Sequence, residues 1–122
     1  TQIDIPCFTS DYFPTIAHIL GVDLQKYQRP YDGENLMPYW EGKKQLRSKP
    51  LAFQFGKQYA LIDNDFKLYA KLDEAPQLFN LIDDSEEKKN LSESQSEKTE
   101  NLSKHYEAWN LSVQNSARGA DY

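Results

Sequence analysis

Two apolar runs in the middle of the chain, residues 59–62 and 66–70, are separated by the polar triplet Asp63-Asn64-Asp65. Asn and Asp tolerate the left-handed backbone that a tight hairpin turn requires, so this pattern predicts a β-hairpin. Residues 51–55 alternate between apolar and other side chains, and residues 77–82 are expected to supply a last strand. The sequence therefore predicts an antiparallel sheet of about four short strands joined by short connections.

The alternation also predicts which side chains face the core. In the first strand we expect Leu51, Phe53 and Phe55 to lie together on one apolar face, because successive side chains of a strand point to opposite sides. In the strand after the hairpin turn, the residues expected to continue this face are Phe66, Leu68 and Ala70.

A helical pattern precedes the sheet. We expect a helix over residues 11–20, with Asp11 as its N-cap and Gly21 as its C-terminal stop. The apolar residues of this segment fall at helical spacing, which predicts one buried stripe. The stripe comprises Phe13, Ile16, Ala17 and Leu20.

A longer helical pattern follows the sheet. Ser94 and Glu97 stand three residues apart, as in a capping box at a helix start. Apolar residues then recur at spacings of four, three and four, and Gly119 ends the pattern. We expect this helix to cover the sheet with Leu102, Tyr106, Trp109 and Val113.

Between the first helix and the sheet, residues 22–42 are rich in turn-forming residues and predict a compact linker. Residues 32–40 predict a tight turn and a short helical turn that docks Leu36, Met37 and Trp40. A basic run, residues 43–49, follows, and we interpret it as a solvated loop in preference to an anion site.

These elements predict an α+β fold, in which a small antiparallel sheet of about four strands is covered by a long C-terminal helix and preceded by one further helix. The net charge of −5 is spread along the chain, without the basic stripe that nucleic-acid binding needs, so no nucleic-acid partner is expected. The apolar runs are too short for a membrane span, which takes about 20 residues.

The search for catalytic groups finds no constellation. His18 and His105 lie in separate predicted helices, without a nucleophile and base arranged around them. The sequence carries no glycine-rich phosphate loop and no Cys/His spacing typical of a metal site. This segment alone therefore lacks the machinery of an enzyme, with no catalytic residue and no metal ligand predicted in it.

Five motifs, in order along nearly the whole chain, resemble the C-terminal part of the type I, formylglycine-dependent sulfatases of the alkaline-phosphatase superfamily. The motifs are Asp11-Tyr12-Phe13-Pro14-Thr15-Ile16 with Gly21, Asp32-Gly33-Glu34-Asn35-Leu36-Met37-Pro38, Asn64-Asp65-Phe66-Lys67-Leu68, Leu78-Phe79-Asn80-Leu81-Ile82-Asp83-Asp84 with Asn90-Leu91, and the ending Trp109, Ser112-Val113, Ser116, Gly119 and Asp121-Tyr122. The chain departs from the family pattern at residues 84–86, where Pro-Gly is usual, and at Ile62 and Phe66, where Arg and Trp are common.

The resemblance implies a parent enzyme that hydrolyses sulfuric esters, with sulfated glycans as the expected substrates. In the family, the Cys or Ser of a C/S-x-P-x-R motif is oxidised to formylglycine, whose hydrate attacks sulfur beside a divalent cation, usually calcium. Cys7 is followed by Phe8-Thr9-Ser10 and is therefore not that nucleophile. Calcium and formylglycine are expected in the parent, outside this segment. The family also implies a secreted or periplasmic location.

The resemblance further implies a division of the chain. Residues 1–45 are expected to form the end of the catalytic α/β domain and a linker, and residues 46–122 the C-terminal subdomain. The apolar beginning of the chain also favours a fragment of a longer polypeptide. The expected partner is the catalytic domain of the same polypeptide, on which the segment packs to help wall the substrate cleft. The candidate substrate contacts, in the loop between the first two strands, are Lys57, Gln58 and Tyr59.

Two alternatives stay open at this point. The first is a stand-alone carbohydrate- or protein-binding module that uses exposed aromatic residues, namely Tyr27, Tyr31, Tyr39 and Trp40. The second is the same subdomain of a related phosphoester or phosphonate hydrolase, since the residues that separate these activities lie outside the segment.

Overall fold

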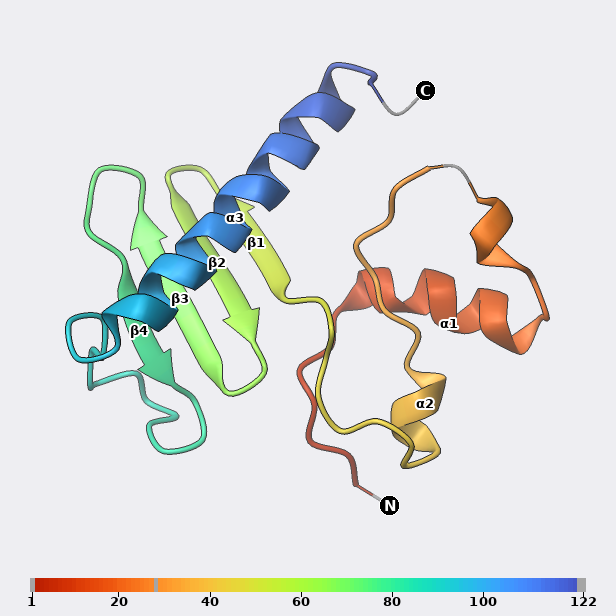
Figure 1. Cartoon of the computed structure of the whole chain (residues 1–122), viewed down its shortest axis with the longest axis horizontal. Coiled ribbons are helices and arrows are strands. Elements are labelled where there is room, and N and C mark those ends of the chain that lie inside the picture. The colour runs from red at the N-terminus through yellow and green to blue at the C-terminus, as the bar shows by residue number, and fades with distance from the viewer. Residues whose placement is uncertain (1, 28, 121–122) are drawn as a thin grey trace. The chain divides into compact units, whose positions relative to one another are not determined.

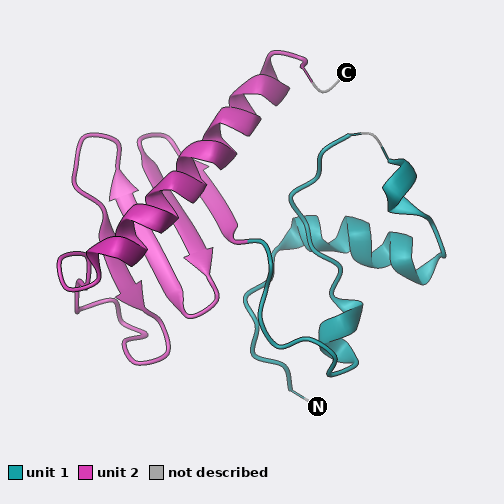
Figure 2. Cartoon of the chain, viewed as in Figure 1, with its two compact units in different colours: residues 1–49, 121–122 teal, residues 50–120 magenta. Residues whose placement is uncertain are grey.

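A computed structural model describes residues 2–27 and 29–120. The chain divides into two compact units (Figure 2). Unit 1 comprises the described residues up to 49, and unit 2 comprises residues 50–120. The two units are considered separately below. The expectation that residues 1–45 end a catalytic domain stays a prediction.

Unit 2 is built on a four-stranded sheet (Figure 1). Its strands are β1 (Leu51–Phe55), β2 (Gln58–Asp63), β3 (Phe66–Lys71) and β4 (Gln77–Asn80). All neighbouring pairs are antiparallel, in the order β1-β2-β3-β4. The predicted hairpin is confirmed, because Asp63 pairs with Phe66 and Asn64 takes a φ of 51° in the turn.

The helix α3 (Ser96–Ala117) crosses one face of this sheet, as Figure 1 shows. The residues under it form a row of directly paired positions, one from each strand. Leu102 and Tyr106 of the helix pack on that row, with Trp109 partly buried against it, whereas Val113 is exposed and its predicted contact is wrong. This confirms the α+β fold with a long C-terminal helix over the sheet. The row consists of Ala52, Leu61, Leu68 and Leu78.

Leu51, Phe53 and Phe55 share one face of β1 as predicted, but the prediction that Phe66, Leu68 and Ala70 continue this face is wrong. Because Ala52 pairs with Leu61, Ala52 faces the helix, and Leu51, Phe53 and Phe55 point to the opposite face. Leu51 is buried there, but Phe55 is 90% exposed. The alternation of apolar and other side chains shows that the two faces of a strand differ in polarity. It does not show which of the two faces the helix covers.

The predicted capping box is also wrong. The N-cap of α3 is Gln95, and the Ser94 hydroxyl donates to the Leu91 carbonyl oxygen instead. The predicted end is confirmed. Gly119 has a φ of 80°, and the N–H of Ala120 donates to the Asn115 carbonyl oxygen at 3.1 Å, which closes the last turn.

Unit 1 contains short helices joined by loops. They are η1 (Thr9–Asp11), α1 (Tyr12–Ile19), η2 (Leu24–Lys26) and α2 (Met37–Trp40). The stop after α1 is as predicted, because Gly21 has a φ of 69° and the N–H of Val22 donates to the Ala17 carbonyl oxygen.

The predicted buried stripe of α1 is correct only at Ala17. Phe13, Ile16 and Leu20 are exposed, and the buried face carries Pro14 and Thr15 beside Ala17. In α2, Tyr39 is buried and Trp40 is exposed, so the predicted docking of Trp40 is wrong. Unit 1 therefore has an uncovered apolar helix face and a polar interior.

Candidate functional site

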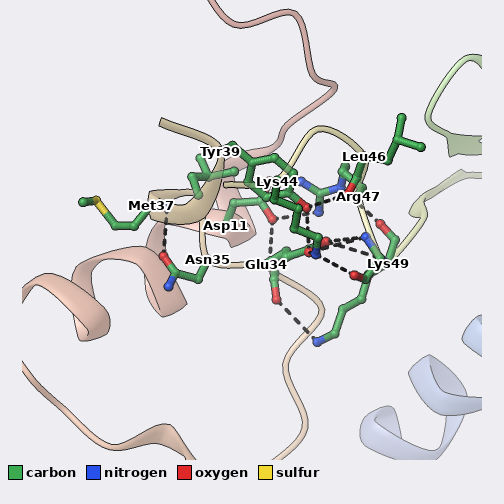
Figure 3. A network of polar contacts seen from close by, with 12 residues as sticks. Asp11, Glu34, Asn35, Met37, Tyr39, Lys44, Leu46, Arg47 and Lys49 are labelled. Atoms are coloured by element: carbon green, nitrogen blue, oxygen red, sulfur yellow. Dashed lines mark hydrogen bonds and ion pairs between the residues drawn. The ribbon is translucent and has the colours of Figure 1, made fainter. Parts of the chain in front are cut away.

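A dense network of charged groups lies in unit 1 (Figure 3). Its first centre is Asp11, whose side chain is 0% exposed. Arg47 donates to both carboxylate oxygens, from Nη1 to Oδ2 at 2.8 Å and from Nη2 to Oδ1 at 3.0 Å. The backbone N–H groups of Glu34 and Phe8 donate to the same carboxylate at 2.7 and 3.0 Å.

These four hydrogen bonds favour the ionised form of the Asp11 carboxyl group. Burial alone would raise the pKa of this carboxyl group, but the hydrogen bonds from Arg47, Glu34 and Phe8 outweigh it and lower the pKa. The Arg47 side chain is 1% exposed. Asp11 is therefore a buried anion matched to a buried cation.

The second centre is Glu34. Its carboxylate accepts hydrogen bonds from the Tyr39 hydroxyl at 2.7 Å, from the Lys44 ammonium, and from the N–H groups of Ser48 and Lys49 at 3.1 and 3.2 Å. Burial opposes the charged form, but these donors, chiefly Lys44 and Tyr39, lower the pKa of Glu34 to about 2. Glu34 is thus an anion throughout the neutral and mildly acidic range.

The network joins segments that are distant in sequence. Thr15 donates to the Asp11 carbonyl oxygen at 2.6 Å and accepts from the N–H of Leu36 at 2.9 Å. Gly33 lies so close to residue 10 that a Cβ there would be 1.9 Å from the Ser10 carbonyl oxygen. Both carboxylates are saturated with donors from the protein itself, so the network has the chemistry of a structural clamp and not that of a general base.

Two sequence-based interpretations need correction here. Asp11 makes no side-chain hydrogen bond that caps α1, although it stands at the N-cap position. The basic run is not simply a solvated loop, because Arg47 is buried against Asp11 and Lys44 pairs with Glu34. The partners lie 36 and 10 residues apart, so no local pattern could pair them.

The three predicted substrate contacts lie at the β1–β2 turn of unit 2. Lys57 is exposed, 3.7 Å from a carboxylate oxygen of Asp73. Gln58 Oε1 accepts from the Tyr69 hydroxyl at 3.3 Å. The ring of Tyr59 stacks on Tyr106 of α3, with centroids 3.8 Å apart and an 8° angle between the planes.

The three side chains do not share one surface. Gln58 and Tyr59 are adjacent in β2 and point to opposite faces of the sheet. One face of the Tyr59 ring is already occupied by Tyr106, and burial raises the pKa of its hydroxyl. Substrate contact by Lys57, Gln58 and Tyr59 stays a prediction.

Among residues 2–27 and 29–120, no group of three or more His, Cys, Asp and Glu side chains is placed to hold a metal ion. In the same ranges, no helix is both long and apolar enough to cross a membrane. Of the four aromatic residues named for a stand-alone module, Tyr39 is buried, whereas Tyr27 and Trp40 are exposed. The stand-alone module stays a prediction.

No protein-family profile matches the chain. Steryl-sulfatase of Homo sapiens is 38% identical to it over 58 residues, which are 48% of this chain and 10% of the human protein. The crystal structure of Ps i-CgsB superposes on it with a TM-score of 0.69 at 25% sequence identity, over 81% of this chain and 23% of that one. These relatives support a C-terminal region of the sulfatase type.

A second structure matches this sulfatase region, namely Ps i-CgsB in complex with k-i-k-neocarrahexaose, with a TM-score of 0.67 at 24% identity over 81% of the chain. The sulfatase region spans about a tenth of the length of steryl-sulfatase and less than a quarter of the Ps i-CgsB chain. Asp11, Thr15, Gly33 and Glu34 of the network all belong to the sequence motifs that resemble the sulfatases.

Proposed function

We propose that this sulfatase region is the non-catalytic C-terminal part of a sulfuric ester hydrolase that acts on sulfated glycans. In this proposal the region packs on the catalytic domain of the same polypeptide and helps to wall the substrate cleft. The observation that carries the proposal is the match to 23% of the Ps i-CgsB chain, combined with the relation to steryl-sulfatase.

The state of the ionisable groups supports the non-catalytic role. The two most enclosed carboxylates, Asp11 and Glu34, already accept hydrogen bonds from several internal donors, and catalysis needs groups that can reach the reacting atoms. The calcium ion and formylglycine that the resemblance implies belong, in this proposal, to the rest of the polypeptide. A carbohydrate substrate is favoured because one structural neighbour was solved with k-i-k-neocarrahexaose.

The uncovered face of α1 supports packing on a further domain. Phe13, Ile16 and Leu20 are exposed on one side of this helix, and exposed apolar patches mark interaction surfaces.

Export to a secreted or periplasmic location is part of the proposal, because sulfated glycans lie outside the cell.

The test is release of inorganic sulfate from a sulfated oligosaccharide by the longer polypeptide that contains this region. A matched phosphate ester serves as the competing substrate, and the variant that replaces the predicted formylglycine precursor by Ala serves as the control. Sulfate release that the control abolishes is the expected result. Release of phosphate in preference to sulfate would assign the region to a related phosphoester hydrolase, and release of neither would overturn the proposal.

A further inference from the structure

The face of the sheet opposite α3 carries an exposed aromatic residue beside polar groups, at its β1–β2 end. The register places Phe55, Gln58 and Lys71 side by side in one row across β1, β2 and β3. Phe55 is 90% exposed, and Gln58 is exposed beside it. The Tyr69 hydroxyl donates to Gln58 Oε1, which fixes this amide from one side and leaves its Nε2 donors for another group.

Phe55, Gln58 and Tyr69 border a shallow hollow of about 380 Å³, which we call the Phe55 hollow. It lies within unit 2 alone. Of its described lining residues, Lys67 is the one charged group, and no carboxylate is among them. The full lining is Phe53, Gln54, Phe55, Gln58, Tyr59, Ala60, Lys67 and Tyr69.

The charge of Lys67 is held in place by Glu87. Lys67 Nζ lies 2.7 and 2.9 Å from the two carboxylate oxygens of Glu87, and both side chains are partly exposed. Glu87 has a φ of 57°, an unusual backbone conformation for a residue with a side chain. An ammonium group has three donors, so Lys67 keeps one for an anion in the hollow.

We propose that the Phe55 hollow binds a sugar ring of a sulfated glycan, with Phe55 as the stacking residue. An exposed aromatic ring binds the apolar face of a pyranose, and the Gln58 amide can donate to a ring hydroxyl. The Lys67 ammonium can donate its third N–H to a sulfate oxygen, and Glu87, the carboxylate that it pairs with, lies outside the lining of the hollow. This inference rests on the proposed function, since it names the part of the region that meets the substrate.

The inference also revises the predicted contacts. Gln58 is retained, because its side chain borders the hollow. The stacking role passes from Tyr59, whose ring is engaged by Tyr106, to Phe55 on the other face of the sheet. Lys67 replaces Lys57 as the cation.

The experiment compares Phe55→Ala with Phe55→Tyr in the longer polypeptide that contains this region. The substrates are a sulfated oligosaccharide and 4-nitrophenyl sulfate, which is too small to reach a distant sugar subsite. Loss of one stacking contact should raise KM for the oligosaccharide roughly three- to tenfold, with 4-nitrophenyl sulfate unaffected. Phe55→Tyr should restore the original KM, because it keeps the ring.

The control is Leu111→Ala, which removes an exposed apolar side chain from α3. It should change neither KM nor the melting temperature. If Phe55→Ala lowers the melting temperature and leaves both KM values unchanged, Phe55 packs on another domain and the inference is wrong. If the unaltered polypeptide releases no sulfate from either substrate, the proposed function itself is wrong. This result differs from a failure of the Phe55 hollow alone, in which sulfate release persists and KM does not change.

Discussion

Asp11 and Glu34 illustrate how single carboxylates can organise a region that has little apolar core. Each accepts hydrogen bonds from several segments, and each stays ionised because those donors outweigh the effect of burial on its pKa. A buried charge of this kind is strongly destabilising once its partner is removed. Unit 1 should therefore respond sharply to changes at these two residues.

Replacement of Asp11 by Asn should destabilise unit 1 by about 3–5 kcal/mol, because it removes the carboxylate that pairs with the buried guanidinium of Arg47. Denaturant unfolding followed by tryptophan fluorescence measures the change. The control is Glu100→Gln, which breaks an exposed pair with Lys104 on α3 and should leave the midpoint where it is. Equal effects of the two substitutions would refute the clamp.

Stability should also depend on pH in one window. The pKa of Glu34 is lowered from 4.5 to about 2, so its contribution is fully present above pH 4.5 and is lost as the pH falls toward 2. Midpoints of unfolding measured from pH 7 to pH 2 should be flat above pH 5 and then fall. Glu34→Gln should reduce that fall, and a decline that begins between pH 7 and pH 5 would contradict the assignment.

Gly33 should tolerate no side chain. In Gly33→Ala the new Cβ would lie 1.9 Å from the Ser10 carbonyl oxygen and 2.9 Å from the Asp11 nitrogen, both of which are backbone atoms. We expect a loss of several kcal/mol, on the order of 3 or more. Gly42→Ala is the matched control. Its φ is 70° but nothing lies within 4 Å, so the cost there should be about 1 kcal/mol.

At the scale of elements, α1 presents an apolar face that unit 1 leaves uncovered. Helices of this kind bury their apolar stripe against another element, and exposed stripes promote association. Phe13, Ile16 and Leu20 are exposed on α1, together with Tyr12 and Ile19.

The chain of 122 residues should therefore self-associate as its concentration rises. Sedimentation velocity over a range of concentrations measures this. The double variant Ile16→Glu, Leu20→Glu should remain monomeric, whereas Leu111→Glu on α3 should not abolish association. A monomeric wild-type chain at high concentration would show that the α1 face needs no partner.

The elements differ in how far the sequence predicts them. The hairpin, the glycine stops after α1 and α3 and the row of Leu102 and Tyr106 follow from local spacing, and all were confirmed. The face of β1 that α3 covers was not predictable, because Ala52 faces the helix through its pairing with Leu61 in the next strand. The Asp11–Arg47 pair also escaped prediction, because 36 residues separate its members.

The same distinction applies to the candidate site. The position of the β1–β2 turn follows from the strand pattern, but the choice between Tyr59 and Phe55 as the free ring depends on where α3 lies. Only the position of Tyr106 shows that the Tyr59 ring is covered and the Phe55 ring is not. No local motif in the sequence shows which face of the sheet α3 covers.

At the scale of the whole molecule, the region matches a minor share of each longer sulfatase-type chain, 10% of steryl-sulfatase and 23% of Ps i-CgsB. Its saturated carboxylates and its uncovered α1 face agree with a supporting part that relies on a catalytic domain elsewhere in the polypeptide. The central claim is therefore that one polypeptide contains both this region and a sulfatase active site.

The most direct test of that claim is to read the coding sequence that precedes residue 1. The account predicts a catalytic domain with a C/S-x-P-x-R motif and the Asp and Asn residues that hold the divalent cation. A start codon immediately before this region, with no such domain encoded upstream, would contradict the account and return the aromatic binding module as the leading hypothesis.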